Sequence, residues 1–338
     1  MNKQKMILTI RKKYEINVNK IIKINKGFGT SNWLIESDSI PYFLKIYDST
    51  HSLNDEKYAL HLSKYAFDRD IRTPKIIPTL SKDLICMDDE HAFTLFEYVQ
   101  GNTLNSLSIQ QMRQTGRLLG QIHRIFTNVN YGYNSETCEW MNIDVKKKEN
   151  EITNYLKIIS NKKHKDEFDE KNIDVLQQKN QFINLIPNLI SKIPQLSSQV
   201  IHGDYSILNL LFDKSELKYV VDFRPPIPFL ISYEIGRIAF PPEHFSQKTW
   251  KKKGFSLIDE YCKENRINCN DVIYAPHIWL LQLIKSTYGI KEHYSKPHNY
   301  QRRLDKFWFE RHNASIIIYD YLEELKNGIS EIWKKYNK

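Results

Sequence analysis

The stretch "IHGDYSILNLLFD", residues 201–213, decides how the chain is interpreted. In a sequence with only 11 glycines, it places one between a histidine and an aspartate and puts an asparagine just before an apolar run. "KYVVDF" follows after the polar turn "DKSEL", and apolar runs on both sides of such a turn predict an antiparallel hairpin. We therefore expect Asn209 and Asp222 to face each other across one end of this hairpin, with Asp204 on the loop before it.

These three side chains suggest a chemistry. Mg²⁺ accepts an amide oxygen and a carboxylate when substrate phosphates complete its octahedral shell. Phosphoryl transfer also requires a base that orients the attacking hydroxyl and a lysine that holds the nucleotide. The sequence thus predicts Asn209 and Asp222 as metal ligands and Asp204 as the base.

Length and composition set the outer limits. A chain of 338 residues suggests two lobes, and 41% hydrophobic with 12% aromatic residues is typical of a folded protein. Its four cysteines lack the spacing of a zinc site or a disulfide framework, so we expect reduced thiols. The apolar patch near the N-terminus is too short for a signal peptide and no run is long enough to span a membrane, so we expect a cytoplasmic protein with no membrane partner.

The charge is basic, with 49 Lys and Arg against 40 Asp and Glu, and a net charge of +9 is compatible with nucleic-acid binding. The lysine-rich stretches "DVKKKEN" and "NKKHKDEFDEK" are interleaved with acidic residues, however, and no nucleic-acid motif accompanies them. We interpret them as solvated helix faces and expect no nucleic-acid partner. A basic nucleic-acid-binding protein remains an alternative.

The pattern of elements predicts an α+β fold. The first hundred residues read as β-strands with one helix over 52–67, which indicates an antiparallel sheet. Residues 108–126 have the 3–4 spacing of an amphipathic helix, and charged helical segments follow over 142–179. From residue 249 onward the pattern remains helical. We expect a nucleotide-binding lobe over 1–98 and a larger, mainly helical catalytic and substrate-binding lobe over 99–338.

Several motifs occur in the order found in one family. "HGDYSILN" resembles the His-x-Asp-x4-Asn signature of the aminoglycoside phosphotransferase and choline-kinase family of small-molecule kinases, and "VVDF" resembles its metal-binding aspartate motif. "KGFGTSN" is similar to the phosphate-covering turn, "YFLKIY" to the lysine strand, "DEKYAL" to the glutamate helix and "FEYVQGNTL" to the hinge. The resemblance spans residues 20–240. It implies a bilobal protein-kinase-like fold, ATP and Mg²⁺ as cofactors, and a small-molecule acceptor hydroxyl.

Lys45 lies in the middle of a predicted strand, where an unpaired cation is normally disfavoured. We interpret it as the lysine that contacts the nucleotide phosphates; the alternative is an edge-strand lysine that points outward. Glu56 shares an inward helical stripe with Leu60 and is its expected partner, and Asp55 is the rival carboxylate.

The remaining nucleotide contacts are expected from main-chain groups. Gly27 and Gly29 allow N–H groups to approach a phosphate closely, and Thr30 adds a hydroxyl; an ordinary hairpin turn is the alternative. Glu97 and Val99 are expected to present a carbonyl and an amide to the adenine edge. His202 is expected to be a buried support for the Asp204 loop, and Tyr205 is either core or a wall of the substrate site.

The departures from the family pattern concern regulation and the acceptor. Gly203 stands where kinases regulated by activation-loop phosphorylation have an arginine, so we expect a small-molecule acceptor. Glu234 stands where the family has an aspartate, and we interpret it as a structural carboxylate that anchors the catalytic loop. We expect the acceptor to contact the helices after residue 240, with Trp279, Tyr288 and acidic residues as candidates.

Further candidates for the acceptor site are Trp308 and Asp259. The resemblance implies phosphorylation of an antibiotic, giving resistance, or of an amino alcohol such as homoserine. A kinase-shaped scaffold with weak or no catalysis, of the kind that the family contributes to spore coats, remains the alternative. The sequence does not indicate an oligomeric state.

Overall fold

A computed structural model describes residues 3–24, 30–48, 52–88, 91–129, 143–295 and 302–336. The chain divides into two compact units. The first comprises Met1–Leu104, Ile125–Tyr133 and Val200–Ile227, and the second comprises Asn105–Arg124, Asn134–Gln199 and Pro228–Lys338. The predicted lobe boundary after residue 98 falls inside the first of these segments, and its role as a boundary stays a prediction.

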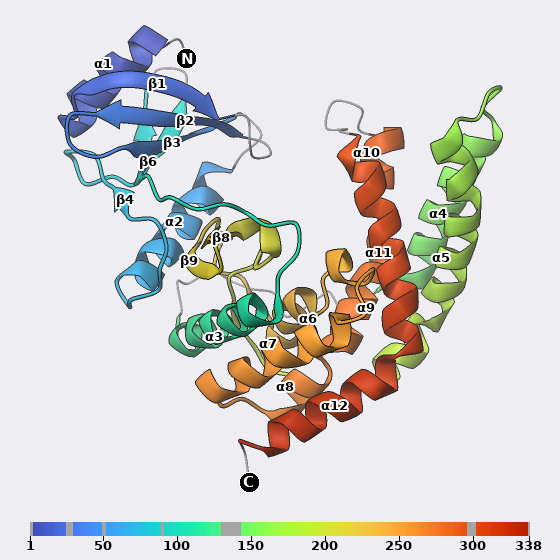
Figure 1. Cartoon of the computed structure of the whole chain (residues 1–338). Helices are drawn as coiled ribbons and strands as arrows, with labels where there is room; N and C mark the ends of the chain where they lie inside the picture. The colour runs from blue at the N-terminus through green and yellow to red at the C-terminus, as the bar shows by residue number, and fades with distance from the viewer. Residues whose placement is uncertain are drawn as a thin grey trace. The chain divides into compact units, whose positions relative to one another are not determined.

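The first unit is built on a six-stranded antiparallel sheet with the strand order β1-β2-β3-β6-β4, and β5 also pairs with β6 (Figure 1). The strands are Val18–Ile24 (β1), Thr30–Ser37 (β2), Tyr42–Tyr47 (β3), Ile76–Ile77 (β4), Cys86–Met87 (β5) and Ala92–Glu97 (β6). Their β-branched and aromatic residues favour extended structure. Because β3 pairs with β2 on one side and β6 on the other, it is an interior strand.

The predicted helix over 52–67 is confirmed as α2 (Leu53–Phe67). Its N-cap is Ser52, whose hydroxyl accepts a hydrogen bond from the main-chain N–H of Asp55 at 3.3 Å. This cap satisfies one of the free amides of the first turn and fixes where the helix begins.

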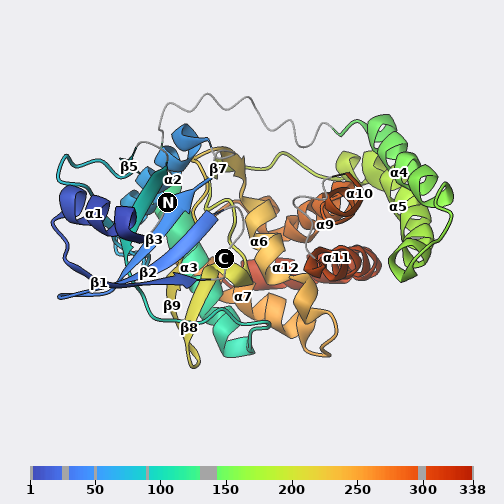
Figure 2. The same ribbon diagram turned by 90° about the horizontal axis from the view of Figure 1, so that it is seen from above.

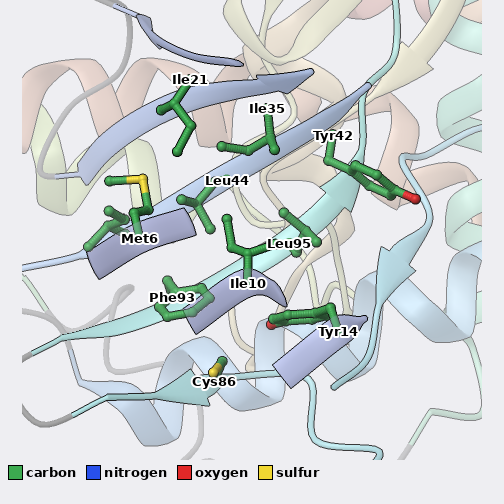
Figure 3. Packing of buried hydrophobic residues seen from close by; sticks show 11 residues of the cluster. Met6, Ile10, Tyr14, Ile21, Ile35, Tyr42, Leu44, Cys86, Phe93 and Leu95 are labelled. Carbon is green, nitrogen blue, oxygen red and sulfur yellow. The ribbon is translucent and has the colours of Figure 1, made fainter. Parts of the chain in front are cut away.

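A second helix in this region was not predicted. Residues Lys3–Tyr14 form α1, and Met6, Ile10 and Tyr14 are its buried side chains. They recur every four residues and therefore lie on one face, which packs on the sheet against Leu44 among other core residues (Figure 3). The prediction of one helix was wrong because this stripe is interrupted by lysines and is shorter than the patterns that identified the other helices.

The predicted hairpin is confirmed within the first unit. Strands Leu210–Asp213 (β8) and Glu216–Val220 (β9) pair antiparallel, and a 3-10 turn over Ile207–Asn209 (η2) precedes them. Asn102 and Phe212 exchange two main-chain hydrogen bonds of 2.8 and 2.9 Å, which attach the segment after β6 to the hairpin.

The second unit is mainly helical. Its helices are Ile109–Phe126 (α3, the last two residues of which belong to the first unit), Val145–Ser160 (α4), Glu167–Ser191 (α5), Ile231–Ala239 (α6), Trp250–Glu264 (α7), Cys269–Ile273 (α8), Ala275–Lys285 (α9), Ile290–Ser295 (α10), Arg303–Asp320 (α11) and Leu322–Lys334 (α12). Short elements complete it: Ser198–Val200 (β7), Pro228–Leu230 (β10) and Pro242–His244 (η3). The helices α4 and α5 lie side by side (Figure 1 and Figure 2). The predicted α+β fold, with an antiparallel N-terminal sheet and a larger helical part, is confirmed.

The lysine-rich stretches carry ion pairs within single helices where the structure describes them. Lys148 pairs with Glu151 at 2.8 Å, and Lys171 pairs with Glu167 at 2.6 Å, each within one helix. The cysteines of the described ranges, Cys86, Cys262 and Cys269, are free. Across the same ranges, every helix is too short or too polar to cross a bilayer.

Candidate active site

Lys45 extends from the interior strand β3, where it lies opposite Asn32 on β2 and Thr94 on β6. The alternative of an edge-strand lysine is therefore excluded. Its Nζ atom lies 3.1 Å from Oδ1 of Asp222 and 3.6 Å from Oε2 of Glu56. One ammonium group thus contacts two carboxylates that come from a helix and from the end of the β8–β9 hairpin.

Glu56 is the helix carboxylate beside Lys45, as the inward stripe with Leu60 indicated. It lies in the first turn of α2, and its main-chain N–H donates to the carbonyl of Ser52 at 3.0 Å. The capped first turn fixes the backbone of Glu56, from which its carboxylate extends toward Lys45. The rival Asp55 is the residue whose amide closes the Ser52 cap.

His202 supports the loop that carries Asp204. Its Nδ1 accepts a hydrogen bond from the main-chain N–H of Asp204 at 3.2 Å, so the ring proton is on Nε2, which lies 3.1 Å from the main-chain oxygen of Val221. The ring is fully buried and packs against Tyr205 and Phe223. Both ring nitrogens are used in these contacts, so His202 is a support and not a base. Tyr205 is also fully buried and belongs to the core.

Asn209 and Asp222 lie at the same end of the hairpin. Leu210 is opposite Val220 in the register, and the main-chain N–H of Val221 donates to the carbonyl of Asn209 at 3.0 Å. This bond continues the ladder by one step and brings Asp222 next to the turn that contains Asn209. The predicted hairpin therefore brings the backbones of the two proposed metal ligands close together in space.

The orientation of the Asn209 amide follows from its hydrogen bond. Its Nδ2 donates to the main-chain oxygen of Asp204 at 2.9 Å, which leaves Oδ1 as the atom that a cation can use. The Asp222 carboxylate would be the second oxygen ligand. In the described ranges, no group of three or more His, Cys, Asp or Glu side chains is arranged to hold a metal. This donor set fits Mg²⁺, which takes one or two protein oxygens and completes its shell with phosphates and water.

Asp222 adopts a backbone conformation that is unusual for any residue except glycine, with φ at +66°. Its environment also biases its charge. Burial alone would raise the pKa of its carboxyl group, but Lys45 and then Arg224 lower it, and the net effect is a pKa below the usual value. The carboxylate is therefore ionised, as a metal ligand must be.

Asp204 is only partly exposed, with 21% of its side chain accessible. Its Oδ2 lies 3.3 Å from Nη2 of Arg224, an arginine to which the sequence assigned no role. Phe223, between Asp222 and Arg224, packs on the His202 ring and is buried. Arg224 thus contacts the Asp204 carboxylate and lies two residues after Asp222 in the chain.

The predicted nucleotide turn is only partly described. Gly27 and Gly29 lie outside the described residues. Thr30 begins β2, and its hydroxyl donates to Oδ1 of Asn32 at 3.1 Å.

Two main-chain amides of the predicted hinge, residues 96–104, donate hydrogen bonds within the first unit. The N–H of Glu97 donates to the Lys75 carbonyl at 2.9 Å, and that of Tyr98 donates to the Pro41 carbonyl at 3.0 Å. Among the described residues, the Val99 amide has no hydrogen-bond partner. The assignment of Glu97 and Val99 as adenine contacts stays a prediction.

Glu234 lies in α6 and is fully buried in the second unit. Its Oε2 lies 3.0 Å from Nε2 of His123 on α3, and Nδ1 of that histidine lies 3.0 Å from the hydroxyl of Tyr261. The carboxylate thus links α6 to α3. A sequence signal for this partner existed, since His123 shares the apolar face of α3 with Leu119 and Phe126.

The predicted acceptor residues fall in different environments. Trp308 is 1% exposed and donates from its indole to Asn172, so it is a core residue. Asp259 accepts a hydrogen bond from Tyr336 and pairs with surface lysines. Trp279 is buried but its ring lies beside the Arg311 guanidinium at 5.0 Å, and Tyr288 is 43% exposed.

Comparison with known proteins finds a matching family and a curated relative. Residues 20–225 match the phosphotransferase enzyme family (APH). A homoserine kinase from Zymomonas mobilis is 25% identical over 201 residues, which cover 59% of this chain and 58% of that protein. The match therefore spans less than two thirds of that relative's length.

Two solved structures share the fold at low sequence identity. A spectinomycin phosphotransferase in complex with ADP and spectinomycin has a TM-score of 0.73 and 17% identity, covering 94% of this chain and 98% of that one. A choline kinase from Cryptosporidium parvum has a TM-score of 0.57 and 14% identity, with 100% of both chains covered.

Proposed function

Because the chain belongs to the phosphotransferase enzyme family, we propose that it transfers the γ-phosphoryl group of ATP to a hydroxyl group of a small molecule. The observation that carries the proposal is the meeting of Lys45, Glu56 and Asp222 within ion-pair distance, at the end of the hairpin that also holds Asn209. A structural role alone would not require two carboxylates around one ammonium in an interior strand.

Each residue has a defined task in this reaction. Lys45, oriented by Glu56, binds the α- and β-phosphates. Asn209 and Asp222 hold Mg²⁺, which when bound screens the charge of the β- and γ-phosphates. Asp204 orients the acceptor hydroxyl: as the acceptor oxygen bonds to the γ-phosphorus and ADP departs, the hydroxyl proton passes to the Asp204 carboxylate. Gly27, Gly29, Thr30, Glu97 and Val99 complete the proposed nucleotide contacts.

Two classes of acceptor are proposed: the hydroxyl of an antibiotic, or that of an amino alcohol such as homoserine. The 25% identity to a homoserine kinase supports the second class. The fold shared with a spectinomycin phosphotransferase is compatible with the first.

The test is a screen of ATP consumption, in Mg²⁺, against a panel of hydroxylated antibiotics and amino alcohols. The wild type is compared with Asp204→Ala and Asp222→Ala. We expect at least one acceptor to support turnover, and Asp204→Ala to lower kcat by about 10²–10⁴ while ATP binding is retained. ATP binding with no turnover on any acceptor would favour a kinase-shaped scaffold. Salt-dependent binding of DNA or RNA without ATP binding would favour the nucleic-acid alternative.

A further inference from the structure

Arg224 lies next to the proposed base, Asp204, and its backbone is held there by the fold. Its main-chain N–H donates to the carbonyl of His202 at 2.9 Å. Phe223, just before it, is buried against the His202 ring. The backbone of Arg224 is therefore tied to the loop that carries Asp204.

Gly203 provides the space for this arrangement. Its φ is +85°, a region that side-chain-bearing residues rarely adopt. A Cβ atom built there would lie 2.6 Å from Cβ and 3.0 Å from Cγ of Arg224. Only glycine at position 203 thus allows the arginine side chain to cross the loop and reach Asp204.

The position of the guanidinium is not explained by stability. Its side chain is 56% exposed, and its contact with Asp204 is a single hydrogen bond of 3.3 Å. An ion pair this exposed is screened by water and contributes little to folding. Arg224 also follows Asp222 by two residues in the chain. Arg224 therefore contacts Asp204 and lies two residues after Asp222, the two carboxylates that the proposed reaction uses.

The transferred phosphoryl group must pass between these two carboxylates. It leaves a nucleotide held at Lys45 and Asp222, and it arrives at an oxygen held at Asp204. Negative charge spreads over its equatorial oxygens during transfer, and a guanidinium presents several fixed donors that match them. We propose, building on the proposed function, that Arg224 is a further catalytic residue that leaves Asp204 on substrate binding and stabilises the transferring phosphoryl group.

This change of partner has two consequences. The guanidinium only donates hydrogen bonds, so no proton leaves it and the acceptor proton still passes to Asp204. Release from Arg224 also frees the Asp204 oxygen to accept that proton. The arginine therefore covers the base when the site is without substrates and assists the transfer when they are bound.

The experiment compares Arg224→Met and Arg224→Lys with a matched control, Arg72→Met. Arg72 belongs to the same unit, is 63% exposed and pairs with Glu216 at 3.4 Å, so it resembles Arg224 in all but position. We measure ADP binding by calorimetry in Mg²⁺, with and without fluoroaluminate, which mimics the transferring phosphoryl group and needs no acceptor. With an active acceptor we also measure kcat and KM.

For the wild type, fluoroaluminate is expected to tighten ADP binding. Arg224→Met should lose about 10–10³-fold of this gain, and of kcat, with the affinity for ADP alone within threefold of the wild type. Arg224→Lys should retain part of the gain, and Arg72→Met all of it.

A wild type that binds no ADP would refute the proposed function itself. A wild type that binds ADP with fluoroaluminate, but loses nothing in Arg224→Met, would overturn only the role of Arg224. So would an Arg224→Met enzyme that is faster than the wild type, because the arginine would then act as a brake on Asp204.

Discussion

Replacing Lys45 by methionine should change the binding of the nucleotide and of the metal in opposite directions. The Lys45 ammonium lies 3.1 Å from the Asp222 carboxylate and 3.6 Å from that of Glu56 and neutralises part of their charge. When a nucleotide and a divalent cation bind, the ion pairs must change. The phosphates then contact the Lys45 ammonium, and the cation binds the Asp222 carboxylate. Lys45→Met removes a partner of the phosphates, but it also removes a competitor of the cation.

The magnitudes follow from the geometry. A charge-assisted hydrogen bond contributes about 1.5–3 kcal/mol, so its loss should weaken ATP binding about 10–150-fold. The Lys45–Asp222 contact that the wild type gives up has one partner 39% exposed and is discounted to about 1 kcal/mol. Without this contact, a divalent cation alone should bind about fivefold more tightly to the variant.

The assay is calorimetric titration of Mg·ATP, together with titration of Mn²⁺ followed by electron paramagnetic resonance. Lys20→Met is the matched control, since Lys20 is an exposed lysine on β1 of the same sheet. If Lys45→Met left ATP affinity within twofold of the wild type, or weakened Mn²⁺ binding as well, the exchange of partners would be wrong.

Three further predictions concern stability. Burial, and then Lys253, lower the pKa of His244 to about 3, and its Nε2 accepts the Leu107 amide, so folding loses stability as the pH falls below the unfolded value of 6.5. In urea titrations His244→Gln should reduce the loss between pH 7 and pH 5 by about 2 kcal/mol. Glu234→Leu should cost about 1–3 kcal/mol in thermal unfolding, because a buried nitrogen of its partner histidine is left without an acceptor. Met6→Ala should cost about 2–5 kcal/mol in urea unfolding, because its fully buried side chain fills the core under the sheet.

Controls separate these effects from general damage. His164 is exposed, so His164→Gln should leave the pH dependence unchanged; an equal flattening there would contradict the assignment to His244. Leu8 on α1 is 65% exposed, and Leu8→Ala should cost far less than Met6→Ala if the helix packs on the sheet as described.

The parts of the site that the sequence predicted are those determined by local backbone patterns. The hairpin follows from two apolar runs around a polar turn, and its register places Asn209 near Asp222. The helical stripe that contains Leu60 pointed to Glu56, and the structure has this residue beside Lys45. Helical periodicity and the residue types of the turn were sufficient to predict these elements.

Other features depend on contacts that no local pattern contains. The pairing of Arg224 with Asp204 depends on a main-chain bond across the loop and on the missing side chain of Gly203. Trp308 was a candidate for the acceptor site because it is aromatic, but its indole donates to Asn172 in the core. Aromatic composition does not distinguish a core ring from a binding ring; the difference lies in burial by segments distant in sequence.

The left-handed backbone at Asp222 determines which substitution can test its charge alone. A side chain at positive φ costs about 1 kcal/mol relative to glycine, and asparagine would tolerate the conformation as well as aspartate does. Asp222→Asn would thus remove the charge and keep the conformation, whereas Asp222→Gly would also make the backbone more flexible. A loss of Mg²⁺-dependent activity in Asp222→Asn can therefore be attributed to the missing charge and not to a changed backbone.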